Sequence, residues 1–301
     1  MKKGIYILIV FLLSAQVVLS QQELTSVKSV KVPVGYTQQL NVVYKKVNNW
    51  EGRVDIYYKS GVNVKPMPIL INMHGGAWRH GNKESQTGFS TYFKLGFAVA
   101  NVEYRLSAQA TAPAAIEDVR CVMMYLINHA DSLNIDVNRI VLSGSSAGAH
   151  LALMAGLMGN NNAQFDKDCT ITNKPYRIAA VIAQSTPSTL FDPNINKVLK
   201  DGAIYEWLGS AKKDDVAFAK SLSPISYINK NNPPIFLTHG DADPRVPYQQ
   251  TVELDAALTK AGVKHLFITI PGGGHGGYDE QQKQIIQAAL IPFLKEHLSI
   301  Q

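Results

Sequence analysis

The stretch that decides the fold is residues 139–155, which read RIVLSGSSAGAHLALMA. An apolar strand is followed by the pattern G-x-S-x-G, centred on Ser146, and then by an apolar helix. Small residues beside the serine permit a very tight turn, which exposes the Ser146 hydroxyl above a sheet and in front of a helix N-terminus. The alternative is that Ser146 is an ordinary loop serine. In that case the strand, the glycines and the helix around it would be there by coincidence. We therefore treat Ser146 as a candidate nucleophile.

Apolar runs typical of buried strands recur along the chain, at residues 68–73, 97–102, 140–143, 178–183, 235–238 and 266–270. Segments with helical spacing lie between or after them, at residues 113–127, 254–258 and 285–298. Three earlier segments, 27–34, 39–47 and 53–58, alternate apolar and polar residues, as in an antiparallel entry to a sheet. The pattern predicts an α/β fold with a mostly parallel central sheet and helices on both faces.

The first residues resemble a targeting segment rather than part of this fold. Lys2 and Lys3 precede an apolar stretch, residues 5–13, that is too short to span a bilayer comfortably. We interpret residues 1–20 as a signal peptide cleaved after Ser20, with an uncleaved anchor as the alternative. The expected location is therefore secreted or periplasmic, without membrane association after cleavage. Residues 21–301 are expected to form a single domain.

Residues 185–232 interrupt the alternation of strands and helices. This segment has no clear strand, contains Pro187, Pro193 and Pro224, and shows helical fragments near residues 203–208. An excursion of this length is usually a functional insertion such as a lid. We expect a short cap-like insertion close to the site.

Charge and cysteine content exclude several classes of function. The formal net charge is +6, and the basic residues are scattered without a run, so no nucleic-acid partner is expected. Cys121 and Cys169 are the only cysteines and are not spaced as a metal pair. In an exported chain they could form a disulfide. Cys121 could equally be a small residue buried in an apolar helix, and both interpretations remain open.

A serine nucleophile needs amide donors for the negative charge that develops on the substrate oxygen. The sequence HGGAW, residues 74–78, directly follows the strand at 68–73. Glycines allow a backbone to approach a carbonyl oxygen closely. We assign the oxyanion amides to Gly76 or Ala77, together with Ala147 after the nucleophile. A plain Gly-Gly turn is the alternative, and we expect His74 to brace the loop.

The nucleophile also needs a base and an acid that orients it. Residues 239–247, HGDADPRVP, follow the strand at 235–238. We choose Asp243 as the acid because it lies further past the strand end and precedes a proline, and Asp241 is expected to make the turn. His239 comes before the acid and too close to the strand end to be the base, so we expect it to have a structural role. The predicted base is His275, in the glycine-rich loop after the last strand.

The loop that carries His275 also contains the pattern G-x-G-x-x-G, through Gly272, Gly274 and Gly277. A dinucleotide site requires a strand-helix-strand unit around that pattern, with an acidic residue on the second strand. Only one helix is expected after these glycines. We therefore predict no organic cofactor, and no metal site.

The order Ser146, Asp243, His275 resembles the triad order of the α/β-hydrolase superfamily. It is closer to secreted bacterial esterase/lipase-like enzymes with an H-G-G-x-W loop, an S-A-G elbow and an H-G-x-x-D acid loop, motifs that span residues 74–275 here. This branch includes acetyl-xylan and feruloyl esterases of plant polysaccharides. The chain departs from the pattern at Ala77, where many lipase-type relatives have a third glycine, and at residues 184–187.

The resemblance implies a serine carboxylic-ester hydrolase that forms an acyl-enzyme on a small ester or an acylated carbohydrate. Charged residues are mixed into the 185–232 segment, which favours small acyl groups over long-chain lipids. Trp78 is expected to bind substrate as an aromatic wall, or else only to pack the loop. The alternatives are a peptidase of the same fold, whose relatives usually have Tyr after the nucleophile, and a non-catalytic binding protein.

Overall fold

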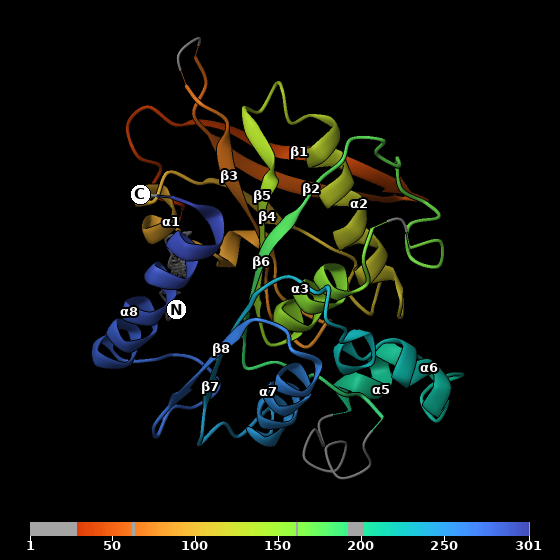
Figure 1. Cartoon of the computed structure of the whole chain (residues 1–301). Coiled ribbons are helices and arrows are strands. Elements are labelled where there is room, and N and C mark those ends of the chain that lie inside the picture. The colour runs from red at the N-terminus through yellow and green to blue at the C-terminus, as the bar shows by residue number, and fades with distance from the viewer. Residues whose placement is uncertain (1–28, 62–63, 161, 192–201, 301) are drawn as a thin grey trace, which may run out of the picture.

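The computed structural model describes residues 29–61, 64–160, 162–191 and 202–300. An eight-stranded sheet runs through the molecule in the order β1-β2-β4-β3-β5-β6-β7-β8 (Figure 1). The strands are β1 Thr37–Val47, β2 Trp50–Tyr58, β3 Met67–Met73, β4 Ala98–Val102, β5 Ile135–Ser145, β6 Ile178–Gln184, β7 Ile235–Gly240 and β8 His265–Ile270. β1 and β2 pair antiparallel with their neighbours, and every pair from β4 to β8 is parallel. The predicted fold class is confirmed.

Helices cover both faces of the sheet (Figure 1). They are η1 Lys83–Ser85, α1 Ser90–Lys94, α2 Ala114–Asn128, α3 Ala147–Leu157, α5 Ala203–Leu208, α6 Val216–Ser221, η2 Pro224–Tyr227, α7 Gln249–Ala261 and α8 Glu280–Leu298. Along β3, Ile69 and Ile71 pack in the cluster that contains α2 and α3, whereas Leu70 packs in the cluster that contains α1 and α8. Burial on both faces explains why the inner strands are continuously apolar.

The prediction of a strand at residues 27–34 is wrong for residues 29–34, which the structure describes. Residues 29–34 form no strand, and the first strand begins at Thr37. Pro33 has no amide proton for a ladder, and its carbonyl accepts a turn hydrogen bond from the Tyr36 amide at 3.2 Å. The expected signal peptide, residues 1–20, lies outside the described residues.

The segment between β6 and β7 carries α5, α6 and η2 in its described part, and it lies beside α3 and α7 (Figure 1). Trp207 and Leu208 of α5 are buried in the same cluster as α3. The Trp207 carbonyl accepts a hydrogen bond from the Ala112 amide at 2.7 Å. The helical fragment predicted at 203–208 is therefore present. It packs against α3 and is hydrogen-bonded to the residue before Pro113.

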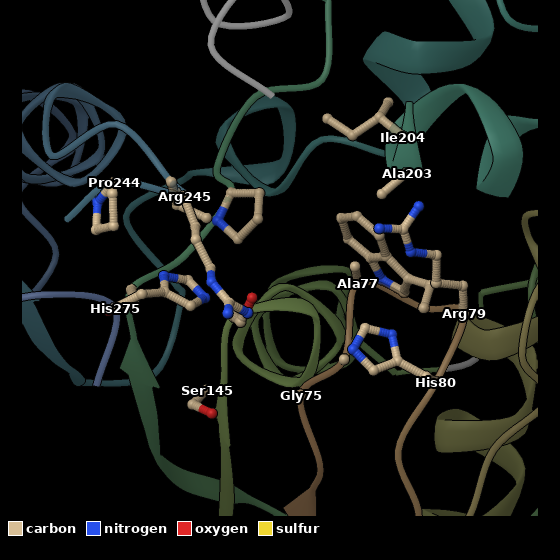
Figure 2. Close-up of a pocket in the computed structure, with 16 residues that line it drawn as sticks. Gly75, Ala77, Arg79, His80, Ser145, Ala203, Ile204, Pro244, Arg245 and His275 are labelled. Carbon is tan, nitrogen blue, oxygen red and sulfur yellow. The ribbon is translucent and has the colours of Figure 1, made fainter. Parts of the chain in front are cut away.

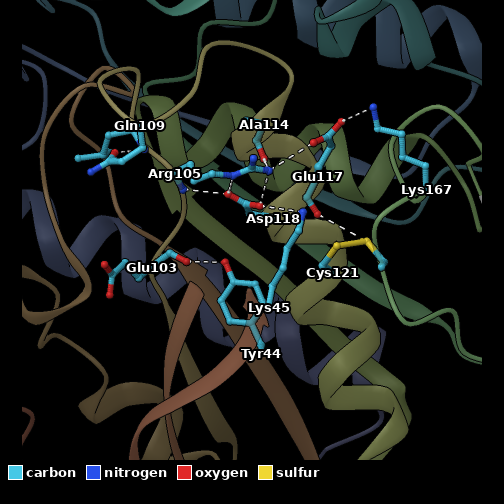
Figure 3. A network of polar contacts seen from close by, with 12 residues as sticks. Tyr44, Lys45, Glu103, Arg105, Gln109, Ala114, Glu117, Asp118, Cys121 and Lys167 are labelled. Atoms are coloured by element: carbon cyan, nitrogen blue, oxygen red, sulfur yellow. Dashed lines mark hydrogen bonds and ion pairs between the residues drawn. A yellow bond between two sulfur atoms is a disulfide. The ribbon is translucent and has the colours of Figure 1, made fainter. Parts of the chain in front are cut away.

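A buried network joins β1 to α2 (Figure 3). The Asp118 carboxylate of α2 receives both the Nε and an Nη of Arg105 at 2.8 Å, and the Lys45 ammonium at 3.1 Å. All three side chains are at least nine-tenths buried. Since a buried charge is costly without a partner, this paired arrangement holds the antiparallel edge of the sheet against α2.

Cys121 of α2 and Cys169 form a disulfide (Figure 3). The bond resolves the two interpretations that the sequence left open. It attaches the loop between α3 and β6 to the middle of α2. Arg120, the neighbour of Cys121, forms a buried ion pair with Asp166 of the same loop. The loop is therefore held by a covalent bond and an ion pair.

Candidate active site

Ser146 lies in the turn between β5 and α3, with φ 54° and ψ −123°. A Cβ atom on Gly144 would lie 2.4 Å from the carbonyl carbon of Gly148, and one on Gly148 would lie 2.2 Å from the Met73 oxygen. Both positions therefore require glycine. The Ser146 amide donates to the Gln184 carbonyl of β6 at 2.8 Å. These contacts stabilise a backbone conformation that is rare for a residue with a side chain.

Asp243 and His275 are brought together from the loops after β7 and β8. Asp243 Oδ2 lies 2.7 Å from His275 Nδ1, within the range expected for an orienting acid and its base. Asp241 instead accepts a hydrogen bond from the Gly272 amide at 2.7 Å, so its side chain joins the loop after β7 to the loop after β8 and does not make the local turn contact expected of it. A Cβ on Gly240 would lie 2.1 Å from the Gly273 oxygen, so glycine lets these two loops approach closely.

The electrostatics of Asp243 favour its ionised form. Burial alone would raise the pKa of this carboxyl, but hydrogen bonds from His239, His275 and the amides of Arg245 and Val246 outweigh burial and lower the pKa well below its ordinary value. The two amides donate to Oδ1 at 2.8 and 3.0 Å. A permanent carboxylate at this position can hold the imidazole of His275 with Nδ1 protonated, which leaves Nε2 to accept a proton.

His239 contributes a contact that sequence reasoning missed. Its Nε2 lies 3.0 Å from Asp243 Oδ2 and 3.1 Å from the Val246 carbonyl, so this nitrogen carries the proton. Its Nδ1 lies 2.6 Å from Thr251 Oγ1. We expected a structural role for His239, and the geometry gives that role a specific form: its ring contacts the carboxylate of Asp243, the residue predicted as the acid. The available signal was the four-residue spacing of His239 and Asp243 at a strand end.

The loop after β3 adopts a conformation that suits an oxyanion site. Gly76 has φ 122°, and a Cβ on it would lie 1.9 Å from the His80 carbonyl oxygen. Among the described residues, no group accepts a hydrogen bond from the amides of Gly76 and Ala77. Ala147 is the first residue of α3, so its amide has no acceptor within the helix. These three amides are the ones assigned from the sequence.

His74 braces this loop. It is buried, its Nδ1 lies 2.7 Å from the Gly75 carbonyl, and its ring stacks on Tyr104 at 4.3 Å. The Tyr104 hydroxyl donates to the His74 carbonyl at 2.8 Å. Burial is the main cause that lowers the pKa of His74. A buried imidazole that contacts the Gly75 carbonyl and the Tyr104 ring agrees with the expected role of His74 in supporting this loop.

A cavity of about 670 Å³ lies at this edge of the sheet (Figure 2). Its walls include Ser146, His275, Gly76 and Ala77, while Asp243 lies behind His275 with its side chain buried. Within the described part of the chain, no hydrogen bond joins Ser146 Oγ to His275, a contact that often tightens only when substrate binds. Ser146, His275 and the predicted oxyanion residues Gly76 and Ala77 therefore line one cavity, which has room for a small ligand.

Trp78 borders the cavity but is only 2 % exposed. Its ring stacks on Trp207 of α5 at 4.5 Å and meets the edge of His150 at 5.0 Å. This packing favours the alternative in which Trp78 holds the oxyanion loop against α5. A contact between Trp78 and substrate stays a prediction.

Neither a metal centre nor a membrane-spanning helix is found in the described ranges. No three or more His, Cys, Asp or Glu side chains gather there in an arrangement that could hold a metal ion. None of the helices in the same ranges combines the length and apolar character needed to cross a bilayer.

Comparisons with known proteins identify the family of this chain. Residues 54–258 match the family model described as BD-FAE. Esterase LipQ and Esterase LipC of Mycobacterium tuberculosis are 30 % and 27 % identical over 69 % and 74 % of this chain, and over 50 % and 56 % of their own lengths. The chain thus spans about half the length of these curated relatives.

Solved structures share the fold. A truncated carbohydrate esterase from gut microbiota superposes with a TM-score of 0.69 at 27 % identity, covering 87 % of this chain and 96 % of its own. Esterase B from Lactobacillus rhamnosis superposes with a TM-score of 0.71 at 17 % identity, covering 90 % and 89 %. The second likeness shows the fold alone.

Proposed function

Because this chain belongs to the BD-FAE family, we propose that it is a serine carboxylic-ester hydrolase that cleaves small-acyl esters through an acyl-enzyme. One observation carries the proposal: Asp243 Oδ2 lies 2.7 Å from His275 Nδ1, and His275 shares a cavity with the strained Ser146. An acid, an imidazole and an elbow serine in this order are the parts of an acyl-transfer site.

In the proposed reaction, Ser146 Oγ attacks the ester carbonyl carbon while His275 Nε2 accepts the hydroxyl proton. Asp243 holds the imidazolium in place, and the amides of Ala147 and of Gly76 or Ala77 stabilise the oxyanion. The tetrahedral intermediate then collapses. The bond to the alcohol oxygen breaks, and the alcohol leaves with the proton from His275. Water repeats the sequence on the acyl-enzyme, releasing the acid and restoring Ser146.

The lining of the cavity supports a small acyl group. The inserted segment bounds the cavity through Pro187, Ala203 and Ile204. The cavity walls are not uniformly apolar, because they also include Arg79 and Arg245. A broad apolar surface would suit a lipase better. Acetyl or feruloyl groups on plant polysaccharides are the finer proposal, supported by the carbohydrate esterase among the structural neighbours.

We also propose that the protein acts outside the cytoplasm, in the periplasm or the medium. Support comes from the signal-like pattern of residues 1–20 and from the Cys121–Cys169 disulfide, a bond that persists mainly in oxidising compartments.

A substrate panel tests the proposed function. Purified protein is assayed with p-nitrophenyl acetate, butyrate and palmitate, with acetylated xylan, with feruloylated sugars and with peptide substrates, and Ser146→Ala is the control. We expect turnover of acetyl and butyryl esters that Ser146→Ala abolishes. A preference for palmitate would contradict the small-acyl proposal, cleavage of peptides alone would indicate a peptidase, and no turnover would indicate a binding protein. Release of acetate or ferulate from polymer decides the carbohydrate part.

A further inference from the structure

The cavity beside Ser146 has an uneven charge. Arg79 and Arg245 both line it, whereas no Asp or Glu of the described residues does. Asp243 is the carboxylate nearest to Arg245 in the sequence. Its side chain is buried, and two imidazoles and two backbone amides already contact it. A concave surface lined by cations concentrates positive potential and attracts anionic ligands.

The two arginines differ in their partners. The Arg79 guanidinium lies 3.6 Å from the Glu206 carboxylate. The Arg245 side chain is exposed, and no described residue forms an ion pair or hydrogen bond with its guanidinium. Figure 2 shows this side chain reaching into the cavity between His275 and the loop that carries Gly75 and Ala77. Arg245 therefore presents its hydrogen-bond donors to whatever occupies the cavity.

The backbone of Arg245 is held in place. Its amide donates to Asp243 Oδ1 at 2.8 Å, so the residue is tied to the acid that orients His275. In the proposed reaction the leaving alcohol takes its proton from His275. The alcohol part of the substrate must therefore lie on the His275 side of the cavity, where Arg245 is. The acyl part lies towards the oxyanion amides.

We propose that Arg245 binds a carboxylate on the alcohol part of the ester, so that O-acyl esters of hydroxy acids are the preferred substrate class. This inference rests on the proposed function. A guanidinium presents paired donors that match a carboxylate, and the interaction is stronger where the cavity limits solvent.

Matched pairs of anionic and neutral esters test the inference. The first pair is 4-acetoxybenzoate and its neutral methyl ester, and 3-acetoxybenzoate varies the position of the charge. The second pair, phenyl hemisuccinate and phenyl butyrate, places the charge on the acyl part instead. We expect wild-type kcat/KM for at least one acetoxybenzoate to exceed that for the methyl ester by about tenfold, as one charge-assisted contact provides. We expect added salt to reduce this preference.

Variants assign the preference to one side chain. Arg245→Gln should bring the ratio of anionic to neutral kcat/KM to about one, and Arg245→Lys should keep part of the preference because its charge remains. Lys260→Gln removes an exposed cation of α7 as the matched control, and it should leave the ratio unchanged.

Three results would overturn the inference. They are equal wild-type turnover of the anionic and neutral acetates, a preference that survives Arg245→Gln, and a preference confined to phenyl hemisuccinate. In each case turnover of the neutral acetates would leave the proposed function standing. If wild-type protein hydrolyses none of these esters, the proposed function fails and this inference fails with it.

Discussion

The Asp243 carboxylate accepts hydrogen bonds from two imidazoles and two backbone amides, so every contact that the structure gives it favours the charged form. Its folded pKa lies below its ordinary value of 3.8, so the stabilisation from these contacts is complete above that pH. The stabilisation is lost as the pH falls further and the folded carboxylate itself becomes protonated. A loss of activity at pH values above 3.8 would therefore not come from protonation of Asp243.

Asp243→Asn should lower kcat by about 10⁴-fold, because a neutral amide no longer holds His275 in the right tautomer. The control is Asp241→Asn, which removes a carboxylate from the same loop and only loosens its contact with the Gly272 amide. Steady-state kinetics with p-nitrophenyl acetate measure both variants, and thermal unfolding checks that both are folded. If Asp241→Asn were the inactive variant, the acid would be misassigned.

At the level of single residues, the sequence predicted those features that depend on the order of residues along the chain and on the local chemistry of turns. The choice of Asp243 over Asp241 followed from its distance past the strand end and the proline after it. The second imidazole on Asp243 could not be predicted, because it depends on how the loop after β7 folds back over His239. The burial of Trp78 could not be predicted for a similar reason. It depends on Trp207, which is more than one hundred residues away in sequence.

Helix α3 meets the inserted segment through His150. This side chain is fully buried, its Nε2 lies 2.7 Å from the Leu222 carbonyl, and its ring contacts Trp78 and Trp207 edge-on. Burial lowers the pKa of His150 from 6.5 to about 4, although the bond to Leu222 opposes that shift. The junction between α3, the loop after β3 and α5 thus depends on a neutral imidazole.

The stability of the fold should therefore depend on pH through His150. The folded pKa is below the unfolded one, so the contribution is complete above pH 6.5 and is lost as the pH falls towards 4. Full loss amounts to about 3 kcal/mol. Urea unfolding between pH 8 and 4 should show a shallower decline for His150→Gln, which does not titrate, than for wild type. His129→Gln, at an exposed histidine, is the control. Identical declines in His150→Gln and wild type would contradict this role.

The disulfide between α2 and the loop after α3 should contribute measurably to stability. Cys121 and Cys169 are 48 residues apart, and a cross-link over a loop of that size typically stabilises a fold by about 2–4 kcal/mol. The double variant Cys121→Ala, Cys169→Ala should have a lower denaturation midpoint in urea. Reduced wild-type protein should resemble the double variant, and equal midpoints for all three forms would show that the bond contributes nothing.

Across the whole molecule, the candidate site is assembled at one edge of the parallel sheet. The proposed oxyanion loop follows β3, the proposed nucleophile Ser146 follows β5, the proposed acid Asp243 follows β7 and the proposed base His275 follows β8. Parallel strands bring their carboxyl ends to the same edge, so the sequence order of four loops becomes one site. This arrangement could be predicted because each motif directly followed an apolar run. The cavity walls and their charge could not, since they depend on how the insertion packs.

The proposed reaction requires Ser146 to be a nucleophile activated by His275. Labelling with a fluorophosphonate, followed by intact mass measurement and peptide mapping, detects such a serine, because the reagent reacts with an activated serine far faster than with an ordinary one. We expect one label per chain, located on Ser146, absent from Ser146→Ala and greatly slowed in His275→Ala, while Ser145→Ala still reacts. Labelling that persists in Ser146→Ala, or a label located on Ser145, would contradict this expectation.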